Sequence, residues 1–360
     1  MSQSPQRILV VKMSSIGDVL LATPVSRALR EAFPQAHLAW AVDRRCAPIV
    51  EENPYLDELI VMRRDTGRLR DIFSYWAETR RYPPFDWTLD LHGLARSALV
   101  TLASRAPFRA GRADAREGSR FAYNRRVVVP CPGAHRVDYY AAFLEELGIP
   151  VRCREMILPQ SPADEEQARV LLADAGKGAH GSGPWVAMSL TAGRPQKCWP
   201  VTSFAQLADR LQQRHGCRVV VLGAPGDRPV ADALKAAMAT QPVDLVGRAG
   251  LKTVAALLRQ VDLFISADTG PMHMAAAVKT PVVALFGPTD PALYGPHRVE
   301  HIVIRKHCRC APRWRHPVCH DNECMRAISV EEVEEAALRL LARPRSALSD
   351  AADGGKENGR

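Results

Sequence analysis

Four short polar segments follow apolar runs in this sequence, and each holds residue types that could bind an anion or move a proton. The first is Ser14-Ser15-Ile16-Gly17-Asp18, which comes directly after the run Ile8–Lys12. Gly17 permits a tight turn, which places Asp18 at the start of the helix that follows. A carboxylate there can cap the helix, and it can also act as a general base at the end of a strand. The residues alone leave both roles open.

The second and third segments carry groups suited to a nucleotide. Residues 191–200 contain the hydroxyl donor Thr191 and the positive charge of Lys197, both of which suit phosphate oxygens. Asp227 follows a glycine-containing turn, where a carboxylate can hold a ribose diol or cap the next helix. The second segment is not a P-loop, because Gly-Lys-Ser/Thr is missing. Gly-x-Gly-x-x-Gly is also missing after the first strand, which argues against a nicotinamide enzyme.

The fourth segment is Asp268-Thr269-Gly270-Pro271-Met272-His273, set between apolar runs at 263–266 and 281–286. Its glycine allows the turn, and the proline after it suits the first position of a helix. Free backbone amides at a helix start favour an anion, typically a phosphate. Asp268 can shape the ligand site or cap the helix, and His273 can face the ligand or pack in the core.

Four of the nine cysteines lie close together near the end of the chain, namely Cys308, Cys310, Cys319 and Cys324. With three histidines nearby they could bind zinc, but the paired Cys-x-x-Cys spacing of zinc knuckles is missing. A reduced or partly disulfide-bonded insertion is the alternative interpretation.

The formal net charge is +9, and the stretch from Arg96 to Arg126 holds eight arginines against Asp114 and Glu117. Such a density favours an anionic partner, such as nucleic acid, lipid headgroups or a phosphorylated glycan. A solvated arginine-rich surface would have the same composition. Aromatic residues are few, at 6% of the chain, so a platform for single-stranded nucleic acid is not expected.

Apolar runs and helical periodicities alternate along nearly the whole chain. The pattern predicts strands at 8–12, 38–42, 59–62, 87–91, 127–129, 185–189, 218–223, 243–245, 263–266 and 281–286. It predicts helices at 19–32, 49–53, 69–80, 92–104, 137–147, 164–175, 204–215, 229–239, 251–260 and 330–342. Repeated strand–helix units form parallel sheets with helices on both faces, and ligands bind at the carboxyl ends of the strands.

The alternation restarts after a glycine-rich stretch, which predicts two domains. We expect an N-terminal domain over 1–175, a linker over 176–183, a C-terminal domain over 184–342 and a disordered tail over 343–360. No apolar run approaches the ~20 residues of a membrane span, and the start lacks the apolar core of a signal peptide. These features predict a cytoplasmic protein whose cysteines are mostly thiols.

In their order and spacing, these segments resemble glycosyltransferase family 9, the lipopolysaccharide heptosyltransferases. The resemblance rests on residues 14–18, Lys197-x-Trp199-Pro200, Asp268-Thr269-Gly270-x-x-His273 and Phe286-Gly287-Pro288-Thr289-Asp290-Pro291. It extends across nearly the whole chain. It implies an α/β protein of GT-B architecture, with two Rossmann-like doubly wound domains and a cleft between them.

The resemblance also implies the substrates. The donor, typically ADP-heptose, would bind the C-terminal domain, and the acceptor, an anionic lipid A–inner core glycolipid, the N-terminal domain. Transfer would be inverting, metal-independent and free of any other cofactor. The arginine stretch would meet acceptor phosphates and carboxylates and the anionic inner leaflet, so the enzyme would be cytoplasmic and peripheral to the inner membrane. Nucleic acid is not expected as a partner. The arginines expected to bind the acceptor are Arg96, Arg109, Arg112 and Arg120.

Carried over to the matching positions, the family pattern implies a role for each motif residue. Asp18 becomes the base that deprotonates the acceptor hydroxyl. The residues implied to bind the donor diphosphate are Thr191, Lys197, Thr269 and Gly270. Those implied to bind the donor sugar and ribose are Asp227, Asp268 and His273.

Two positions of this sequence depart from the family pattern. In addition, the contact to the nucleotide base is implied to come from backbone atoms. Asp227 stands where many relatives have Glu, so its arm toward the ribose is shorter. Cys198 stands where relatives usually have Arg, which alters the expected phosphate contacts. The backbone at Val246 and Gly247 would meet the nucleotide base.

Two other function classes stay open. One is a different GT-B enzyme acting on another nucleotide sugar, such as a sugar-nucleotide 2-epimerase, and the other is a non-catalytic binder of nucleotide or polyanion. An epimerase normally needs several carboxylates and a histidine near the donor sugar, rather than a lone Asp18 opposite it. A non-catalytic binder would not need Asp18, Lys197 and Asp268 together.

Overall fold

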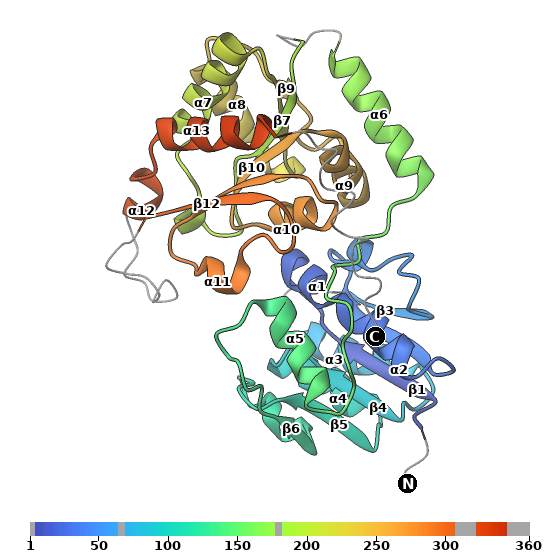
Figure 1. The fold of residues 1–360 in the computed structure, drawn as a ribbon. Coiled ribbons are helices and arrows are strands. Elements are labelled where there is room, and N and C mark those ends of the chain that lie inside the picture. The colour runs from blue at the N-terminus through green and yellow to red at the C-terminus, as the bar shows by residue number, and fades with distance from the viewer. Residues whose placement is uncertain (1–3, 64–68, 177–181, 307–321, 344–360) are drawn as a thin grey trace, which may run out of the picture. The chain divides into compact units, whose positions relative to one another are not determined.

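The computed structural model describes residues 4–63, 69–176, 182–306 and 322–343. The chain forms two units, each built on a parallel six-stranded sheet (Figure 1). The N-terminal unit spans Met1–Glu165 together with Leu251–Ala256 and Asp290–Arg298, and the C-terminal unit holds the remaining residues. The division falls near the start of helix α6 (Pro162–Gly176), upstream of the glycine-rich stretch expected to be the linker.

The sheet of the N-terminal unit has the strand order β3-β2-β1-β4-β5-β6, and all its strand pairs are parallel. Its strands are β1 (Arg7–Val11), β2 (His37–Asp43), β3 (Glu58–Met62), β4 (Trp87–Asp90), β5 (Phe108–Arg112) and β6 (Arg125–Val127). This is the order of a Rossmann-type sheet, whose direction of winding reverses between β1 and β4. Ligands bind such sheets at the carboxyl ends of the strands beside that reversal.

Helices cover both faces of this sheet. The helical segments are α1 (Ile16–Ala22), α2 (Pro24–Ala32), η1 (Ala47–Ile49), α3 (Leu69–Arg80), α4 (Ala95–Ala103), η2 (Ser119–Ala122), α5 (Arg136–Glu145) and α11 (Pro291–Tyr294). Right-handed crossovers place helices on opposite faces when the chain winds in opposite directions. Accordingly α5 packs against α1 and α2 on one face, while α3 packs against α4 and α4 against η2 on the other (Figure 1).

The C-terminal unit repeats the same topology with the order β12-β11-β10-β7-β8-β9. Its strands are β7 (Trp185–Ser189), β8 (Arg218–Leu222), β9 (Val243–Asp244), β10 (Leu263–Ala267), β11 (Val282–Phe286) and β12 (His301–Arg305). Its helical segments are η3 (Pro195–Lys197), α7 (Val201–His215), η4 (Pro225–Asp227), α8 (Arg228–Ala237), α10 (Gly270–Ala277), α12 (Glu323–Arg326) and α13 (Val330–Leu341), and α9 (Leu251–Gln260) contributes to both units. The winding reverses between β7 and β10, so the carboxyl ends of those two strands are the expected ligand site.

Two predicted helices are wrong in their extent. The helix predicted over 19–32 is two helices, α1 and α2, which meet at Thr23 and Pro24. Proline has no amide hydrogen to continue the first helix, and it suits the first position of the second. The short helix predicted over 49–53 is instead the 3-10 turn η1 (Ala47–Ile49), which shares only Ile49 with that range.

Three strands also differ from the prediction. β5 and β12 were not predicted, because Phe-Arg-Ala-Gly-Arg and His-Ile-Val-Ile-Arg lack the long apolar run of a central strand. The strand predicted over 127–129 ends at Val127 and begins two residues earlier than expected. In β5 a Cβ on Gly111 would lie 2.3 Å from the ring of Tyr123, so only glycine fits there. Neighbouring strands, rather than local apolarity, hold these segments in the sheets.

No helix among the described residues is long and apolar enough to cross a membrane. The tail predicted to be disordered lies, from residue 344 onward, outside the described residues.

Candidate functional site

Asp18 lies in the first turn of α1, directly after the carboxyl end of β1. Its Oδ2 accepts hydrogen bonds from the Ser15 hydroxyl at 2.9 Å and the Ser15 amide at 3.3 Å. Capping therefore uses one carboxylate oxygen. The other, Oδ1, lies 3.8 Å from the ammonium of Lys12. The side chain of Asp18 is 35% exposed, so a substrate can reach a carboxylate that is already oriented by its other oxygen.

Lys12 is the buried counter-charge of Asp18. Its side chain is only 5% exposed, and its ammonium lies 5.1 Å from the centre of the Tyr140 ring on α5. Burial raises the pKa of Asp18, but the Lys12 ammonium and the Ser15 hydrogen bonds outweigh it and hold that pKa below its ordinary value. Burial lowers the pKa of Lys12, but Tyr140 and Asp18 outweigh it and raise that pKa. Both groups are therefore charged at neutral pH.

His92 follows β4, the strand beside β1, and it brings a neutral ring to the same sheet edge. Burial, with the positive charges of Lys12 and Arg96, lowers the pKa of His92 to about 2. Its Nε2 accepts from the guanidinium of Arg96 at 3.0 Å, so the proton of the neutral ring is on Nδ1. The buried Asp90 holds this loop by accepting from the His92 amide at 2.8 Å and from Tyr123 at 2.7 Å.

Two of the four predicted acceptor arginines lie at this edge. Arg96 donates to Ser14 Oγ at 2.6 Å and pairs with Asp43 at 3.2 Å, which places its guanidinium beside the loop that carries Asp18. Arg112, at the carboxyl end of β5, pairs with Asp114 at 2.8 Å and lies 5.0 Å from the Tyr139 ring centre on α5.

The other two predicted acceptor arginines lie elsewhere. Arg109 donates to the carbonyl oxygens of Ala122 at 2.9 Å and Ala106 at 2.7 Å, so its guanidinium stabilises loops around β5. Arg120 is exposed on η2 and lies over the ring of Phe121 at 5.0 Å. The structure does not bring either of them to the edge that carries Asp18.

In the C-terminal unit, Lys197 and Asp268 form the central ion pair. The ammonium nitrogen of Lys197 lies 2.5 Å from Asp268 Oδ2, although the two residues are 71 positions apart in the sequence. Lys197 ends η3 after β7, and Asp268 follows β10, the neighbouring strand. The pair therefore sits where the winding of this sheet reverses, with side-chain exposures of 17% and 8%.

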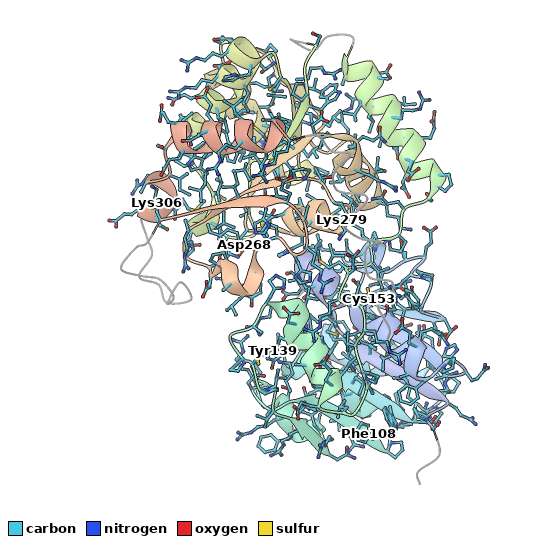
Figure 2. All side chains as sticks on the ribbon, viewed as in Figure 1. Phe108, Tyr139, Cys153, Asp268, Lys279 and Lys306 are labelled. Atoms are coloured by element: carbon cyan, nitrogen blue, oxygen red, sulfur yellow. The ribbon has the colours of Figure 1, made fainter. Side chains whose placement is uncertain are left out.

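The segment after Asp268 begins α10 as the sequence predicts (Figure 2). Thr269 caps the helix, since its hydroxyl accepts from the Met272 amide at 3.3 Å and exchanges a hydrogen bond with Ser266 at 3.0 Å. Gly270 is the first residue of the helix, so its amide lies at the positive end of the helix dipole. His273 is buried, with Nε2 3.9 Å from Asp268 Oδ1.

Thr191 and Asp227 are brought together across β7 and β8. The Thr191 hydroxyl donates to Asp227 Oδ1 at 2.9 Å, and the Ala224 amide donates to Oδ2 at 2.7 Å. Gly247 lies beside η4, because a Cβ on it would be 3.1 Å from the Cα of Pro225. The Val246 carbonyl accepts from the guanidinium of Arg228. The residues predicted to bind ribose and base thus share one corner of the unit.

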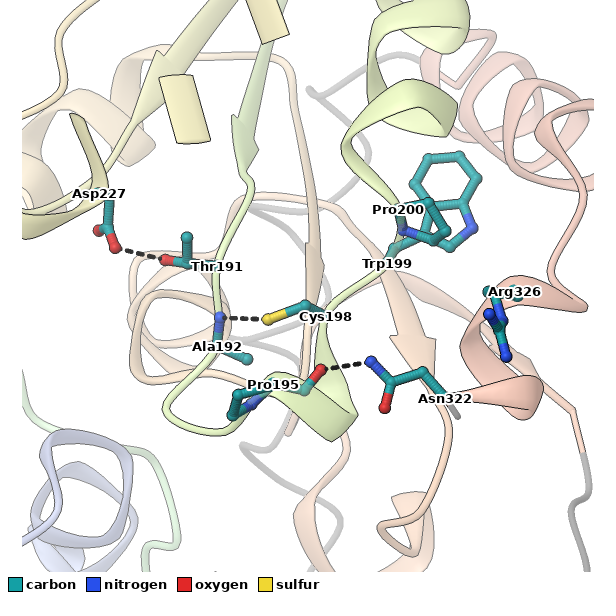
Figure 3. Close-up of a pocket in the computed structure, with 9 residues that line it drawn as sticks. All are labelled: Thr191, Ala192, Pro195, Cys198, Trp199, Pro200, Asp227, Asn322 and Arg326. Carbon is teal, nitrogen blue, oxygen red and sulfur yellow. Dashed lines mark hydrogen bonds between the residues drawn. The ribbon is translucent and has the colours of Figure 1, made fainter. Parts of the chain in front are cut away.

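A pocket of about 620 Å³ opens beside this corner (Figure 3). It is lined by Thr191, Ala192, Pro195, Cys198, Trp199, Pro200, Asp227, Asn322 and Arg326. The Asn322 side chain donates to the Pro195 carbonyl at 2.7 Å, which ties the loop of Lys197 to the segment before α12. Arg326 supplies a positive charge in a wall that otherwise carries one carboxylate, Asp227.

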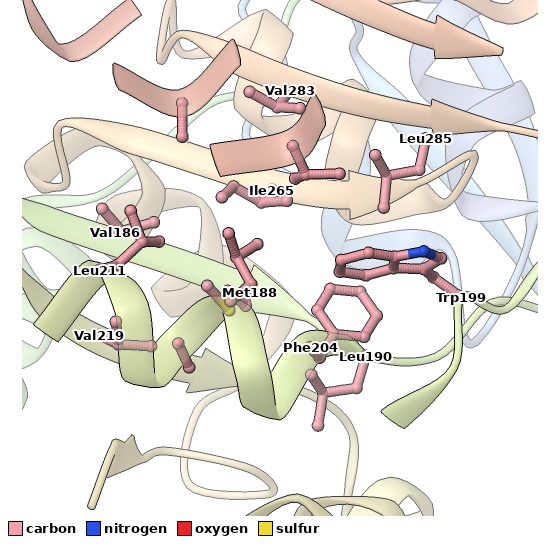
Figure 4. Packing of buried hydrophobic residues seen from close by; sticks show 14 of the residues in the cluster. Val186, Met188, Leu190, Trp199, Phe204, Leu211, Val219, Ile265, Val283 and Leu285 are labelled. Atoms are coloured by element: carbon pink, nitrogen blue, oxygen red, sulfur yellow. The ribbon is translucent and has the colours of Figure 1, made fainter. Parts of the chain in front are cut away.

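Trp199 anchors the loop that carries Lys197. Its ring is 2% exposed and packs edge-on to Phe204 at 4.8 Å between ring centres, within the main apolar core of the unit (Figure 4). Its indole nitrogen donates to the Ile328 carbonyl at 3.0 Å. The Lys-x-Trp-Pro motif therefore combines a cation paired with Asp268 and a buried anchor two residues later.

Three residues of these two groups were not predicted, and they are Lys12, His92 and Arg326. A signal was present for the first two, because a lysine ends the apolar run of β1 and a histidine follows that of β4. No local signal marks Arg326, whose place depends on how α12 packs. Of the cysteines considered as zinc ligands, Cys324 is buried in α12, and the other three lie outside the described residues.

Each group suits a distinct part of one reaction. The C-terminal group offers an ammonium, helix-start amides and hydroxyl and carboxylate groups, which suits a nucleoside diphosphate. The N-terminal group offers an oriented carboxylate among cations, which suits removing a proton from an anionic substrate.

Comparison with known proteins agrees with this chemistry. The family model of glycosyltransferase family 9 (heptosyltransferase) matches residues 76–322. Among similar proteins, lipopolysaccharide heptosyltransferase 1 of Pseudomonas aeruginosa is 30% identical over 85% of each chain. Lipopolysaccharide core heptosyltransferase OpsX of Haemophilus influenzae is 26% identical over 82% of this chain and 83% of its own.

Solved structures show the same architecture. A glycosyl transferase of family 9 from Veillonella parvula superposes with a TM-score of 0.81 at 27% identity, over 95% of this chain and 99% of its own. The E. coli heptosyltransferase WaaC with ADP has the same fold, with a TM-score of 0.67 at 24% identity, over 93% of this chain and 99% of its own. The expected GT-B architecture of two Rossmann-like domains is thereby confirmed. With more than half of its residues matched by the family model, this chain belongs to glycosyltransferase family 9, the heptosyltransferases, and is a glycosyltransferase.

Proposed function

We propose that this enzyme transfers a heptose from ADP-heptose to the inner core of lipopolysaccharide, with inversion at the anomeric carbon and without a metal ion. The relatives that carry this proposal are named lipopolysaccharide heptosyltransferases. The single observation that supports it best is the Lys197–Asp268 pair at 2.5 Å, where the winding of the C-terminal sheet reverses.

The C-terminal unit would hold the donor. Lys197 and the amides at the start of α10 would face the diphosphate, whose charge increases as the bond to the sugar breaks. Asp268 holds the ammonium of Lys197 in place and, with His273, would face the donor sugar. Thr191 and Asp227 would bind the ribose side of the nucleotide, and the backbone at Val246 and Gly247 would meet the base. Lys197 and the amides at the start of α10 would supply positive charge to the leaving group, and this supports transfer without a divalent ion.

The N-terminal unit would activate the acceptor. Oδ1 of Asp18 would take the proton of the acceptor hydroxyl while the oxygen of that hydroxyl forms a bond to the anomeric carbon of the donor sugar. The bond from that carbon to the diphosphate oxygen breaks on the opposite side, and ADP leaves with the electron pair. A single displacement of this kind inverts the anomeric configuration.

The acceptor is expected to be an anionic glycolipid of the lipid A–Kdo type. Arg96 and Arg112 support this, because they bring guanidinium groups to the sheet edge that carries Asp18. A glycolipid acceptor would place the enzyme at the cytoplasmic surface of the inner membrane.

The test is transfer from ADP-heptose to a truncated lipopolysaccharide acceptor by the wild type and by Asp18→Asn. We expect the wild type to form the product with inverted configuration, in the presence of EDTA, and Asp18→Asn to lose about a hundredfold to ten-thousandfold in kcat. Mass spectrometry measures how much product forms, and NMR gives the anomeric configuration of the product.

The chain offers a matched control. Asp164 closes a capping box like that of Asp18, since its Oδ2 accepts from the Ser161 amide at 3.1 Å and hydroxyl at 2.6 Å. Asp164→Asn should therefore weaken a helix cap but leave transfer intact. No transfer by the wild type, or full activity of Asp18→Asn, would overturn the proposal, and release of an epimerised sugar would favour an epimerase.

A further inference from the structure

One face of the N-terminal unit carries most of the exposed large apolar side chains of the described residues. Of the six in this class, five belong to this unit, and they are Phe73, Trp76, Leu102, Phe121 and Val128. Phe73 is 75% exposed, and Phe121 is 73% exposed. Aromatic side chains so far from a core are unusual in a soluble protein and indicate an interaction surface.

The fold places four of these residues on helices that cover one side of the sheet, namely Phe73 and Trp76 on α3, Leu102 on α4 and Phe121 on η2, whereas Val128 follows β6. α3, α4 and η2 cover the face opposite to that of α2 and α5, with α4 packed between the other two. On α3, Phe73, Trp76 and Arg80 recur at intervals of three and four residues, so they form one exposed stripe. The buried Tyr75 and Thr79 mark the opposite stripe, which faces the sheet. Leu102 is the exposed large apolar residue of α4, and Phe121 lies on η2.

Positive charge surrounds the same side chains. Exposed arginines on or next to these elements are Arg80, Arg81, Arg105, Arg116, Arg120, Arg125 and Arg126. Two acidic side chains described on this side are engaged, since Glu78 pairs with Arg81 at 2.8 Å and Glu117 accepts from the Ala95 amide at 3.2 Å. Guanidinium groups lie over two of the aromatic rings, with Arg80 6.0 Å from Trp76 and Arg120 5.0 Å from Phe121.

We propose that this face, formed by α3, α4 and η2, docks on the surface of an anionic lipid bilayer. Aromatic rings insert at the level of the headgroups, while the arginines meet lipid phosphates in a surface of opposite charge. The proposal rests on the proposed function in one respect, because a lipid-linked acceptor gives the enzyme a reason to be at a membrane. Docking itself requires no transfer.

The charge of this face also favours a bilayer over two other partners, a second copy of the chain and a nucleic acid. A symmetric dimer through this face would bring the same arginines of two copies together, which like-charge repulsion disfavours. A nucleic acid would satisfy the arginines but would leave Phe73 and Leu102 on helices without the groove geometry that stacks bases. An anionic bilayer satisfies the charge and the apolar side chains together.

The experiment is co-sedimentation of the full chain with vesicles of phosphatidylglycerol and phosphatidylethanolamine, compared with phosphatidylcholine alone. We expect binding to the anionic vesicles only, weakened by salt. Replacing Arg80 and Arg125 together by Gln should weaken it roughly fivefold for each arginine. The double variant Phe73→Ser/Phe121→Ser should also weaken vesicle binding, but it should leave transfer to a soluble, deacylated acceptor unchanged.

The matched control is Val170→Ser, which removes an exposed apolar side chain from α6, outside this face. It should bind vesicles like the wild type, and circular dichroism should show all variants to be folded. The proposal is overturned if the wild type does not bind anionic vesicles, or if neither double variant changes the binding. It is also overturned if the Phe73→Ser/Phe121→Ser variant instead abolishes a dimer seen by light scattering, or if the face binds RNA but not vesicles. Vesicle binding without any transfer would leave docking standing and refute the proposed function.

Discussion

At the scale of single residues, the proposed catalytic role of Asp18 is compatible with the capping role that the sequence offered as its alternative. Its Oδ2 completes the cap of α1 through Ser15, and Oδ1 remains for chemistry, 3.8 Å from Lys12. Capping and the proposed proton transfer therefore do not compete, because the cap uses Oδ2 and the proposal uses Oδ1. The cap fixes the orientation of the carboxylate, and orientation is what a general base needs before its pKa matters.

The first prediction at this scale concerns Lys12 and the pH dependence of transfer. The ammonium holds the pKa of Asp18 low, so Asp18 stays ionised as the pH falls. Lys12→Met removes that charge, and the pKa of Asp18 should rise. The acid limb of kcat/KM should then move to higher pH, with the largest loss of activity in mildly acidic buffer. The other charged neighbour of Lys12 is Arg112, and His92 is neutral in this range because its pKa is about 2.

Lys12→Arg is the control for this pH shift. It keeps a positive charge beside Asp18 and should restore the position of the acid limb, even if the larger side chain lowers kcat. An equal loss of activity at every pH in Lys12→Met would show that Lys12 has only a structural role.

At the scale of elements, short loops at strand ends depend on buried anchors behind them. Lys197 forms the ion pair with Asp268, and the loop that carries it is held by Trp199, whose indole nitrogen donates to the Ile328 carbonyl. The same logic applies after β4, where the buried Asp90 accepts from the backbone that carries His92. The position of each polar side chain at a strand end therefore depends on a buried residue two positions away in the sequence.

Trp199→Ala provides the prediction at this scale. Loss of a fully buried ring from the main core of the C-terminal unit should lower the free energy of unfolding by about 3–5 kcal/mol, measured by urea denaturation. Because the loop of Lys197 loses its anchor, the KM for the donor should also rise. Trp76→Ala, at an exposed position, should change stability by no more than about 0.5 kcal/mol. Similar losses from both variants would contradict the assignment of Trp199 as the anchor.

At the scale of the whole molecule, the residues proposed to bind the donor all lie in the C-terminal unit, whereas Asp18 lies in the N-terminal unit. Donor binding and acceptor activation should therefore be separable by mutation. In calorimetric titrations with ADP, Asp18→Asn should keep the wild-type Kd within about twofold. Lys197→Ala should weaken ADP binding roughly tenfold to a hundredfold, as expected for a lost hydrogen bond to a charged group. If Asp18→Asn weakened ADP binding as much as Lys197→Ala does, this division would be wrong.

The sequence by itself determined the local features of this protein. Apolar periodicity predicted most central strands and helices, and the turn residues after β1, β7, β8 and β10 predicted which strand ends carry the polar groups assigned to the proposed site. The prediction from sequence failed where a segment's local pattern does not match its place in the fold. β5 contains two arginines and therefore lacks the apolar pattern of a strand, but pairing with the neighbouring strands holds it in the sheet. The prediction also failed at α1 and α2, because the local periodicity continues across Pro24 and indicates one helix where the structure has two.

Only the tertiary structure decided which of these groups meet. Strand pairing places β1 beside β4 and β7 beside β10, and this brings His92 toward Asp18 and joins Lys197 to Asp268 across 71 residues. The same packing turned Arg109 toward backbone carbonyls and left Arg120 exposed beside Phe121. The physical reason is that a helix or a turn depends on residues a few positions apart, whereas strand order depends on contacts between distant segments that no local pattern encodes.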